Sequence, residues 1–226
     1  TQADGMALLR LLQLASPALP VGAFAYSQGL EAAVAAGLVT DEATASAWMH
    51  GLLNGPLTTI DLAIFARLHV AFSAGEVESA SRWSAFLWAS RATAELQAED
   101  RHLGAALARV LVTLGVADPI DSPGSTTPRT FAQMFALATA TWRIDLGAAT
   151  QAFAFTWAEA QTSAAVRLVP LGQSAGVRIL SALAHEIPGA VDTALAVDDR
   201  DLGGAAPLQA LLSSAHETQY SRLFRS

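Results

Sequence analysis

The five histidines of this 226-residue chain are the first candidates for metal binding or acid–base chemistry. No two of them lie three or four residues apart, so no helix would present a pair of imidazoles to one ion. The chain also has no cysteine, which excludes thiolate catalysis, disulfides and cysteine-based metal sites. We therefore predict no cofactor and no tight metal site, for nickel or another ion, within one chain. The histidines are His50, His69, His102, His185 and His216.

Two carboxylates, Glu95 and Glu99, lie four residues apart on one predicted helix and could take part in acid–base catalysis. Arg91 and Arg101 flank them, which favours a salt-bridged surface or interface, because burying unpaired charge is costly. The chain has no GxSxG motif, and without lysine it cannot form a Walker A loop. We predict no catalytic residues and no enzymatic activity.

The charge of the chain restricts its partners. The net charge is −7 and all 13 basic residues are arginines, which argues against a nucleic-acid or anionic-membrane partner. The longest apolar stretch, Gly104 to Ala117, is interrupted by Arg109 and is too short to cross a bilayer. Because no charged-then-apolar signal segment opens the sequence, we expect a soluble, cytoplasmic protein.

The elements that would position these residues are predicted to be helices. The composition is 52% hydrophobic and rich in alanine, the best helix former. Apolar residues at helical spacing predict a first helix that should end near Ser16. The same spacing predicts a second helix at about 26–36. It continues through 76–114, which is long enough for two helices.

Proline and glycine divide the later segments. Pro188 and Gly189 should separate a helix at 174–184 from a weaker helical segment near 191–197. No stretch alternates with the period of a strand for long enough to predict one. We therefore predict an all-α fold, a single-domain helical bundle of roughly eight to ten helices that spans residues 1–226.

The last part of the chain, residues 203–226, should be a short helix from Pro207 to about His216 followed by a flexible C-terminal tail. The tail, Glu217 to Ser226, combines aromatic residues and arginines, which are enriched at interfaces. It could bind a partner, or it could fold back on its own bundle. Composition alone leaves both alternatives open.

The segment after the first helix also has two interpretations. Pro17 and Pro20 stiffen it, Gly22 permits a close backbone approach, and Phe24 and Tyr26 offer large contact areas. A stiff segment loses little entropy on binding and would make a good docking element. It could equally be a buried connection that holds the bundle together.

The segment from Leu11 to Glu31 reads LLQLASPALPVGAFAYSQGLE. It resembles the N-terminal signature of the UreF family of urease accessory proteins, in which an apolar helix leads into Ser-Pro, Leu-Pro-(Val/Ile)-Gly, an aromatic residue and Ser-x-Gly-Leu-Glu. Residues 91–109, residues 157–176 with VRLVPLGQSAG at their end, and the ending HETQYSRLFRS are similar to further family segments in the same order. The resemblance covers essentially the whole chain.

This resemblance implies an all-α protein that dimerises and binds the accessory protein UreD, called UreH in some organisms. That complex recruits the GTPase UreG and docks on apo-urease, where nickel and carbon dioxide are delivered to the metal centre. The resemblance also implies a modulator of the GTPase, similar to a GTPase-activating protein. An unrelated helical-bundle interaction protein is the alternative outside the family.

The resemblance and the residue types together give two sets of candidate residues. A GTPase-modulating role needs an exposed arginine or glutamine near the nucleotide, and the candidates are Arg91, Glu95 and Arg101. The predicted partner-binding residues come from the segment Leu11 to Glu31, which we call the first motif, and from the tail. They are Pro20, Gly22, Phe24, Tyr26, Ser27, Glu31, Glu217, Tyr220, Arg222, Leu223, Phe224 and Arg225.

Overall fold

The computed structural model describes residues 2–119 and 129–226, with side chains from residue 5 onward, and these residues form helices joined by turns and short loops. No described residue lies in a β-strand, which confirms the predicted all-α fold. In chain order the helices are α1 (Gln2–Leu14), the 3₁₀ turn η1 (Ala23–Ala25), α2 (Leu30–Ala35), α3 (Glu42–Leu52), the π-helical segment η2 (Leu53–Leu62), α4 (Ala63–Ser73), α5 (Val77–Ala89), α6 (Ala94–Thr113), α7 (Phe131–Thr141), α8 (Leu146–Leu168), α9 (Gln173–Ala196) and α10 (Pro207–His216).

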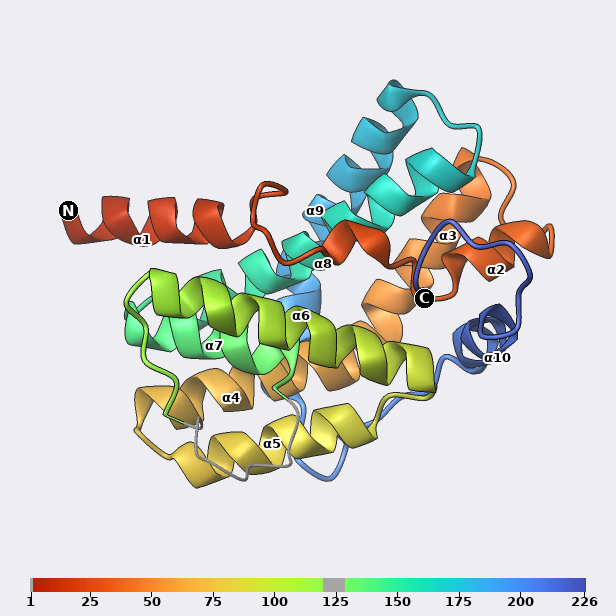
Figure 1. Ribbon diagram of the computed structural model, residues 1–226. Helices are drawn as coiled ribbons and strands as arrows, with labels where there is room; N and C mark the ends of the chain where they lie inside the picture. The colour runs from red at the N-terminus through yellow and green to blue at the C-terminus, as the bar shows by residue number, and fades with distance from the viewer. Residues whose placement is uncertain (1, 120–128) are drawn as a thin grey trace.

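The core lies where α4, α7 and α8 pack together. Phe65 of α4 stacks on Phe153 of α8 with ring centroids 4.7 Å apart, and Phe135 of α7 meets both rings edge to face. Such aromatic contacts add directional attraction to the burial of large apolar surfaces. The other helices surround this cluster, except that α1 projects from the body of the bundle (Figure 1). None of the described helices is long and apolar enough to cross a membrane.

Several helix ends follow the signals in the sequence. Asp41 caps α3 in a reciprocal capping box with Thr44, and Gly37 ends the turn after α2 with a φ of 72°. The 76–114 region divides as predicted into α5 and α6, with Thr93 capping α6. The three prolines and one glycine from Asp118 to Pro128 predict a loop there, and most of these residues lie outside the part of the chain that the structure describes.

Two predicted boundaries were wrong. The expected helix at 26–36 begins only at Leu30, because Gln28 and Gly29 adopt positive φ values of 54° and 86°. The expected break at Pro188 does not occur, and α9 runs continuously from Gln173 to Ala196. Its buried stripe continues at helical spacing on both sides of the proline, and this packing outweighs one lost backbone hydrogen bond. That stripe consists of Ile179, Leu183, Ile187, Ala190, Val191 and Ala194.

Candidate functional site

The two segments that the sequence singled out, the first motif and the tail, lie against each other in the structure. The backbone N–H and hydroxyl of Ser27 both donate to the Ser226 backbone oxygen, and the Arg225 N–H donates to the Ala25 carbonyl. The C-terminal end of the chain therefore sits beside η1 and α2 (Figure 1). Of the two alternatives left open for the tail, the structure has the one in which it folds back on the bundle.

Glu31 is the main acceptor for the tail. It lies in the first turn of α2 and is buried. Its carboxylate accepts hydrogen bonds from the Leu223 N–H at 2.7 Å and the Phe224 N–H at 2.8 Å. One oxygen also lies 3.2 Å from Nε2 of His216. A buried carboxylate needs such donors, because an unpaired buried charge is strongly unfavourable. Glu31 thus fixes the tail backbone to α2.

A second carboxylate, Glu95, completes the polar cluster from the first turn of α6. One of its oxygens lies 2.8 Å from Nδ1 of His216, and the other accepts from Arg222 at 2.9 Å. The side chain of Glu217 accepts from the Glu95 backbone N–H. We call Glu31, Glu95, His216 and Arg222 the tail clamp. The clamp joins α2 and α6 to α10 and the tail that follows it, and its two carboxylates lie 185 and 121 residues before His216 in the chain.

An apolar anchor holds the same tail from the other side. The side chain of Phe224 is only 4% exposed. The guanidinium of Arg167, near the end of α8, lies 4.8 Å from the centre of its ring and also donates to the Phe24 carbonyl. A cation over an aromatic face attracts the ring electrostatically. Phe224 is therefore part of the hydrophobic core, and its burial makes it an anchor of the tail.

The predicted partner-binding residues divide into buried supports and exposed side chains. Tyr26, Ser27, Glu31 and Phe224 are buried, and Phe24 is half-buried. Tyr220 is completely exposed, and Leu223 is 57% exposed beside it in the chain. The exposed members, which form the outward surface of the site, are Pro20, Gly22, Glu217, Tyr220, Arg222, Leu223 and Arg225.

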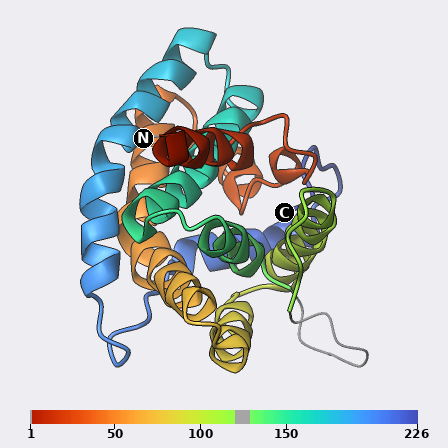
Figure 2. The same cartoon turned by 90° about the vertical axis from the view of Figure 1, so that its left-hand side faces the viewer.

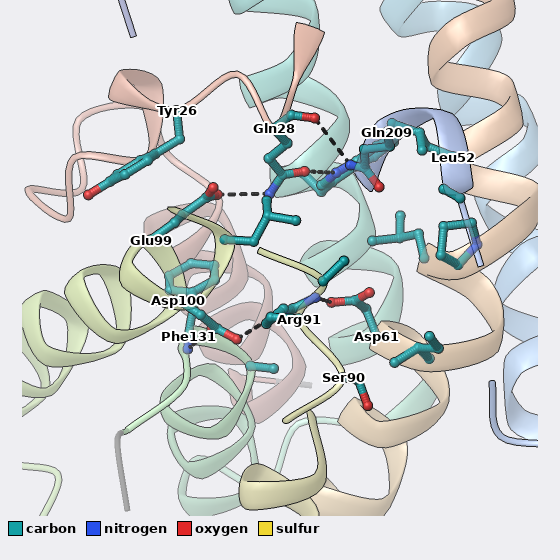
Figure 3. Close-up of a pocket in the computed structure, with 18 of the residues that line it drawn as sticks. Tyr26, Gln28, Leu52, Asp61, Ser90, Arg91, Glu99, Asp100, Phe131 and Gln209 are labelled. Carbon is teal, nitrogen blue, oxygen red and sulfur yellow. Dashed lines mark hydrogen bonds and ion pairs between the residues drawn. The ribbon is translucent and has the colours of Figure 1, made fainter. Parts of the chain in front are cut away.

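A cavity of about 310 Å³ lies beneath the motif, between η2, α6, α8 and the chain before α10, and its mostly apolar lining contains a few charged and polar side chains. Figure 3 shows Gln28 at its wall, where its amide donates to Glu99 at 2.8 Å and its carbonyl oxygen accepts from Trp157. Glu99 also accepts from the Ser226 hydroxyl. Burial raises the pKa of Glu99 to about 7, although these hydrogen bonds favour the charged form. The cavity wall is thus connected to the tail.

The same cavity contains Arg91, which is placed between two carboxylates. Its guanidinium lies 2.7 Å from Asp61 and 2.9 Å from Asp100 (Figure 3). Burial by itself would lower the pKa of Arg91. The two flanking carboxylates outweigh this effect and hold the pKa above its ordinary value. Fully engaged in this way, Arg91 has a structural role in joining η2 to α6 and is not presented to a partner.

The three GTPase-modulating candidates are not brought together. Arg91 faces the cavity, and Glu95 belongs to the tail clamp. Only Arg101 is exposed, and it forms no ion pair with any described residue. No group of three or more His, Asp or Glu side chains in residues 2–119 and 129–226 is arranged to hold a metal ion.

The predicted sets of site residues leave out four residues that organise the site: Gln28, Glu99, Arg167 and His216. From the sequence, Glu99 is a candidate only as a carboxylate paired with Glu95, and His216 only as a histidine for metal binding or acid–base chemistry. Gln28 lies inside the recognised motif, and Arg167 lies inside VRLVPLGQSAG, so the motifs contained a signal for these two. His216 begins the recognised ending HETQYSRLFRS, but that ending does not show its partners, which lie 121 and 185 residues away in the chain. Only the folded structure brings these charges together.

The fold and the site together define an all-helical protein whose tail is fixed at the surface by buried polar contacts. A family model described as UreF matches residues 39–184 of the chain. Proteins named urease accessory protein UreF are similar over nearly the full length. That of Alkalilimnicola ehrlichii is 45% identical over 98% of this chain and 97% of its own, and that of Pseudomonas putida strain W619 is 47% identical over 98% of both. The chain belongs to the UreF family of urease accessory proteins.

Proposed function

We propose that this chain is an adaptor in urease maturation that acts with UreD (UreH) to recruit the GTPase UreG to apo-urease for assembly of the nickel metallocentre. Family membership supports the urease context. One structural observation supports the adaptor role: the exposed Tyr220 and Leu223 are held on a tail whose backbone is fixed by Glu31. A pre-ordered apolar surface binds without a large ordering cost. We further propose that the protein is cytoplasmic, consists of one domain, and acts as a homodimer within the complex.

The outward surface of the tail can be tested without removing its anchors. We expect the double variant Tyr220→Ser, Leu223→Ser to fold normally, because both side chains are exposed. We expect its co-purification with UreD or UreG to fall by at least about tenfold, because interface anchors each contribute on the order of 1 to 2 kcal/mol. Co-expression of the urease operon followed by affinity capture measures this loss.

The matched control is Val112→Ser on α6, which removes an apolar side chain that is 68% exposed and lies outside the site. It should retain normal capture. Normal capture by the tail double variant would refute the proposed surface. Equal loss in both variants would show a general effect of reduced surface apolarity and would equally reject a specific role for the tail.

A second role, regulation of UreG GTP hydrolysis, is favoured by one observation, the exposed and unpaired position of Arg101 among the described residues. An arginine that reaches a nucleotide must be free of carboxylate partners, and Arg91 does not meet this requirement. The same reconstituted complex tests this role. If this protein changes the rate of GTP hydrolysis by UreG and Arg101→Ala removes the change, the regulatory role is supported. If the protein does not change that rate, the regulatory role is rejected and only the adaptor role remains.

A further inference from the structure

His216, the last residue of α10, is fully buried and has a carboxylate oxygen on each side of its ring. Nδ1 lies 2.8 Å from Glu95, and Nε2 lies 3.2 Å from Glu31. A neutral imidazole has one N–H donor and one lone pair, so it can satisfy only one ionised carboxylate. Two ionised carboxylates require two donors. A neutral His216 would therefore leave a ring lone pair facing one of the two carboxylate oxygens.

The other hydrogen bonds of the two carboxylates bear on the protonation state of the ring. Glu31 already accepts two backbone N–H groups, and Glu95 accepts from the guanidinium of Arg222. Both carboxylates are thus in settings that stabilise the ionised form. Only an imidazolium at His216 would donate from both ring nitrogens to these two carboxylates. With an imidazolium the tail clamp has two negative and two positive charges and is neutral.

The position of the ring at the end of a helix favours the same charge state. The C-terminal carbonyls of a helix carry a partial negative charge that attracts cations in the last turn. The charged or titratable groups that face the ring are Glu31 from α2 and Glu95 from α6, with Arg222 and Glu217 of the tail adjoining Glu95. No described basic side chain is bonded to the ring.

We propose that His216 is a protonation-controlled latch for residues 217–226, which holds the tail on α2 and α6 as an imidazolium and releases it when the proton is lost. Deprotonation leaves a lone pair facing one carboxylate and gives the clamp a net charge of −1. In a buried site that repulsion is not screened by solvent. When His216 loses its proton, the hydrogen bonds from the Leu223 and Phe224 N–H groups to Glu31 break, and the side chain of Phe224 leaves its buried position in the core.

The direction follows from the proton count, so the tail is held at lower pH and released as pH rises. The decisive variant is Glu95→Gln. Its amide can donate to the lone pair of a neutral His216 while its oxygen still accepts from Arg222, and His216 can donate to Glu31. Every group is then satisfied without a second proton on the ring. The tail of this variant should stay bound when His216 is neutral.

Two measurements on the full chain test the latch between pH 6 and 9. Nitrogen-15 NMR of the histidine ring reports the protonation state of His216, and hydrogen exchange reports the protection of the Leu223 and Phe224 amides. After correction for intrinsic exchange, we expect protection in the wild type to fall by about tenfold or more, in step with loss of the ring proton. Glu95→Gln should show a much smaller loss.

Two controls separate the latch from other titrations. His185→Gln removes an exposed histidine of α9 and should leave the pH profile unchanged. Glu99→Gln removes the carboxyl that binds the Ser226 hydroxyl and should leave the transition linked to His216 in place. Constant protection of Leu223 and Phe224 in the wild type would overturn the proposal. A neutral His216 with the tail still protected would do the same, even if Glu95→Gln failed to fold.

Discussion

At the scale of single residues, the site depends on buried carboxylates that accept hydrogen bonds from the tail. Glu31 and Glu99 each accept hydrogen bonds from the tail, and each is shielded from solvent. They differ in their compensation. Glu31 receives two backbone N–H donors and the ring of His216, whereas Glu99 receives one amide and one hydroxyl. Weaker compensation leaves burial dominant at Glu99 and raises its pKa.

The raised pKa of Glu99 predicts a pH-dependent stability. The carboxyl of Glu99 has a pKa of about 7 in the folded chain, against an ordinary value of 4.5, so folding takes up a proton at pH values between the two. The contribution of Glu99 is most favourable below about pH 4.5 and is lost as pH rises through about 7. We expect Glu99→Gln to be more stable than wild type at pH 8 by about 3 kcal/mol, and much less so at pH 5.

Urea unfolding at the two pH values measures this difference. Glu78→Gln on α5 is the control, because Glu78 is exposed and should change stability little at either pH. An equal effect of Glu99→Gln at pH 5 and pH 8 would mean that Glu99 does not take up a proton on folding.

At the scale of elements, local signals predicted most helices, and the failures have physical causes. Asp41 and Thr93 cap helices through contacts within three residues, which a sequence displays directly. The start of α2 depends instead on pairing of Ala25 and Ser27 with residues at the other end of the chain. Pro188 is tolerated because the helix around it is held by packing. Long-range pairing and packing have no local sequence signal.

The close approach of α6 to the chain before α7 gives a prediction at this scale. A Cβ added at Gly104 would overlap the carbonyl group of Arg129, so Gly104→Ala must displace backbone. We expect a loss of about 1 to 3 kcal/mol in unfolding free energy. Gly51→Ala in α3 is the matched control, because nothing lies within 4 Å of its added Cβ.

The control should be stabilised by about 0.5 to 1 kcal/mol, since alanine is the better helix former. Urea unfolding of both variants makes the comparison. Stabilisation of Gly104→Ala to the same extent as Gly51→Ala would show that α6 has room to move away from Arg129.

At the scale of the whole molecule, the two ends of the recognised sequence form one site. The family signature at Leu11–Glu31 and the ending HETQYSRLFRS were predicted as two surfaces. The structure shows that the tail lies on the signature segment, where Ser27 donates hydrogen bonds to it and Glu31 accepts hydrogen bonds from it. Glu99 of α6 adds a further contact to Ser226. The residue types were predictable from the motifs. Their division into buried supports and exposed contacts was not, since it depends on the fold.

The most direct test of this account locks the tail in place. The chain has no cysteine, so Ser27→Cys with Ser226→Cys allows one disulfide between motif and tail, read by mass spectrometry. If the seated tail and the motif together form the partner surface, the oxidised variant should capture UreD and UreG as well as its reduced form does. Capture by the reduced form alone would show that partners bind a released tail, and would contradict the account.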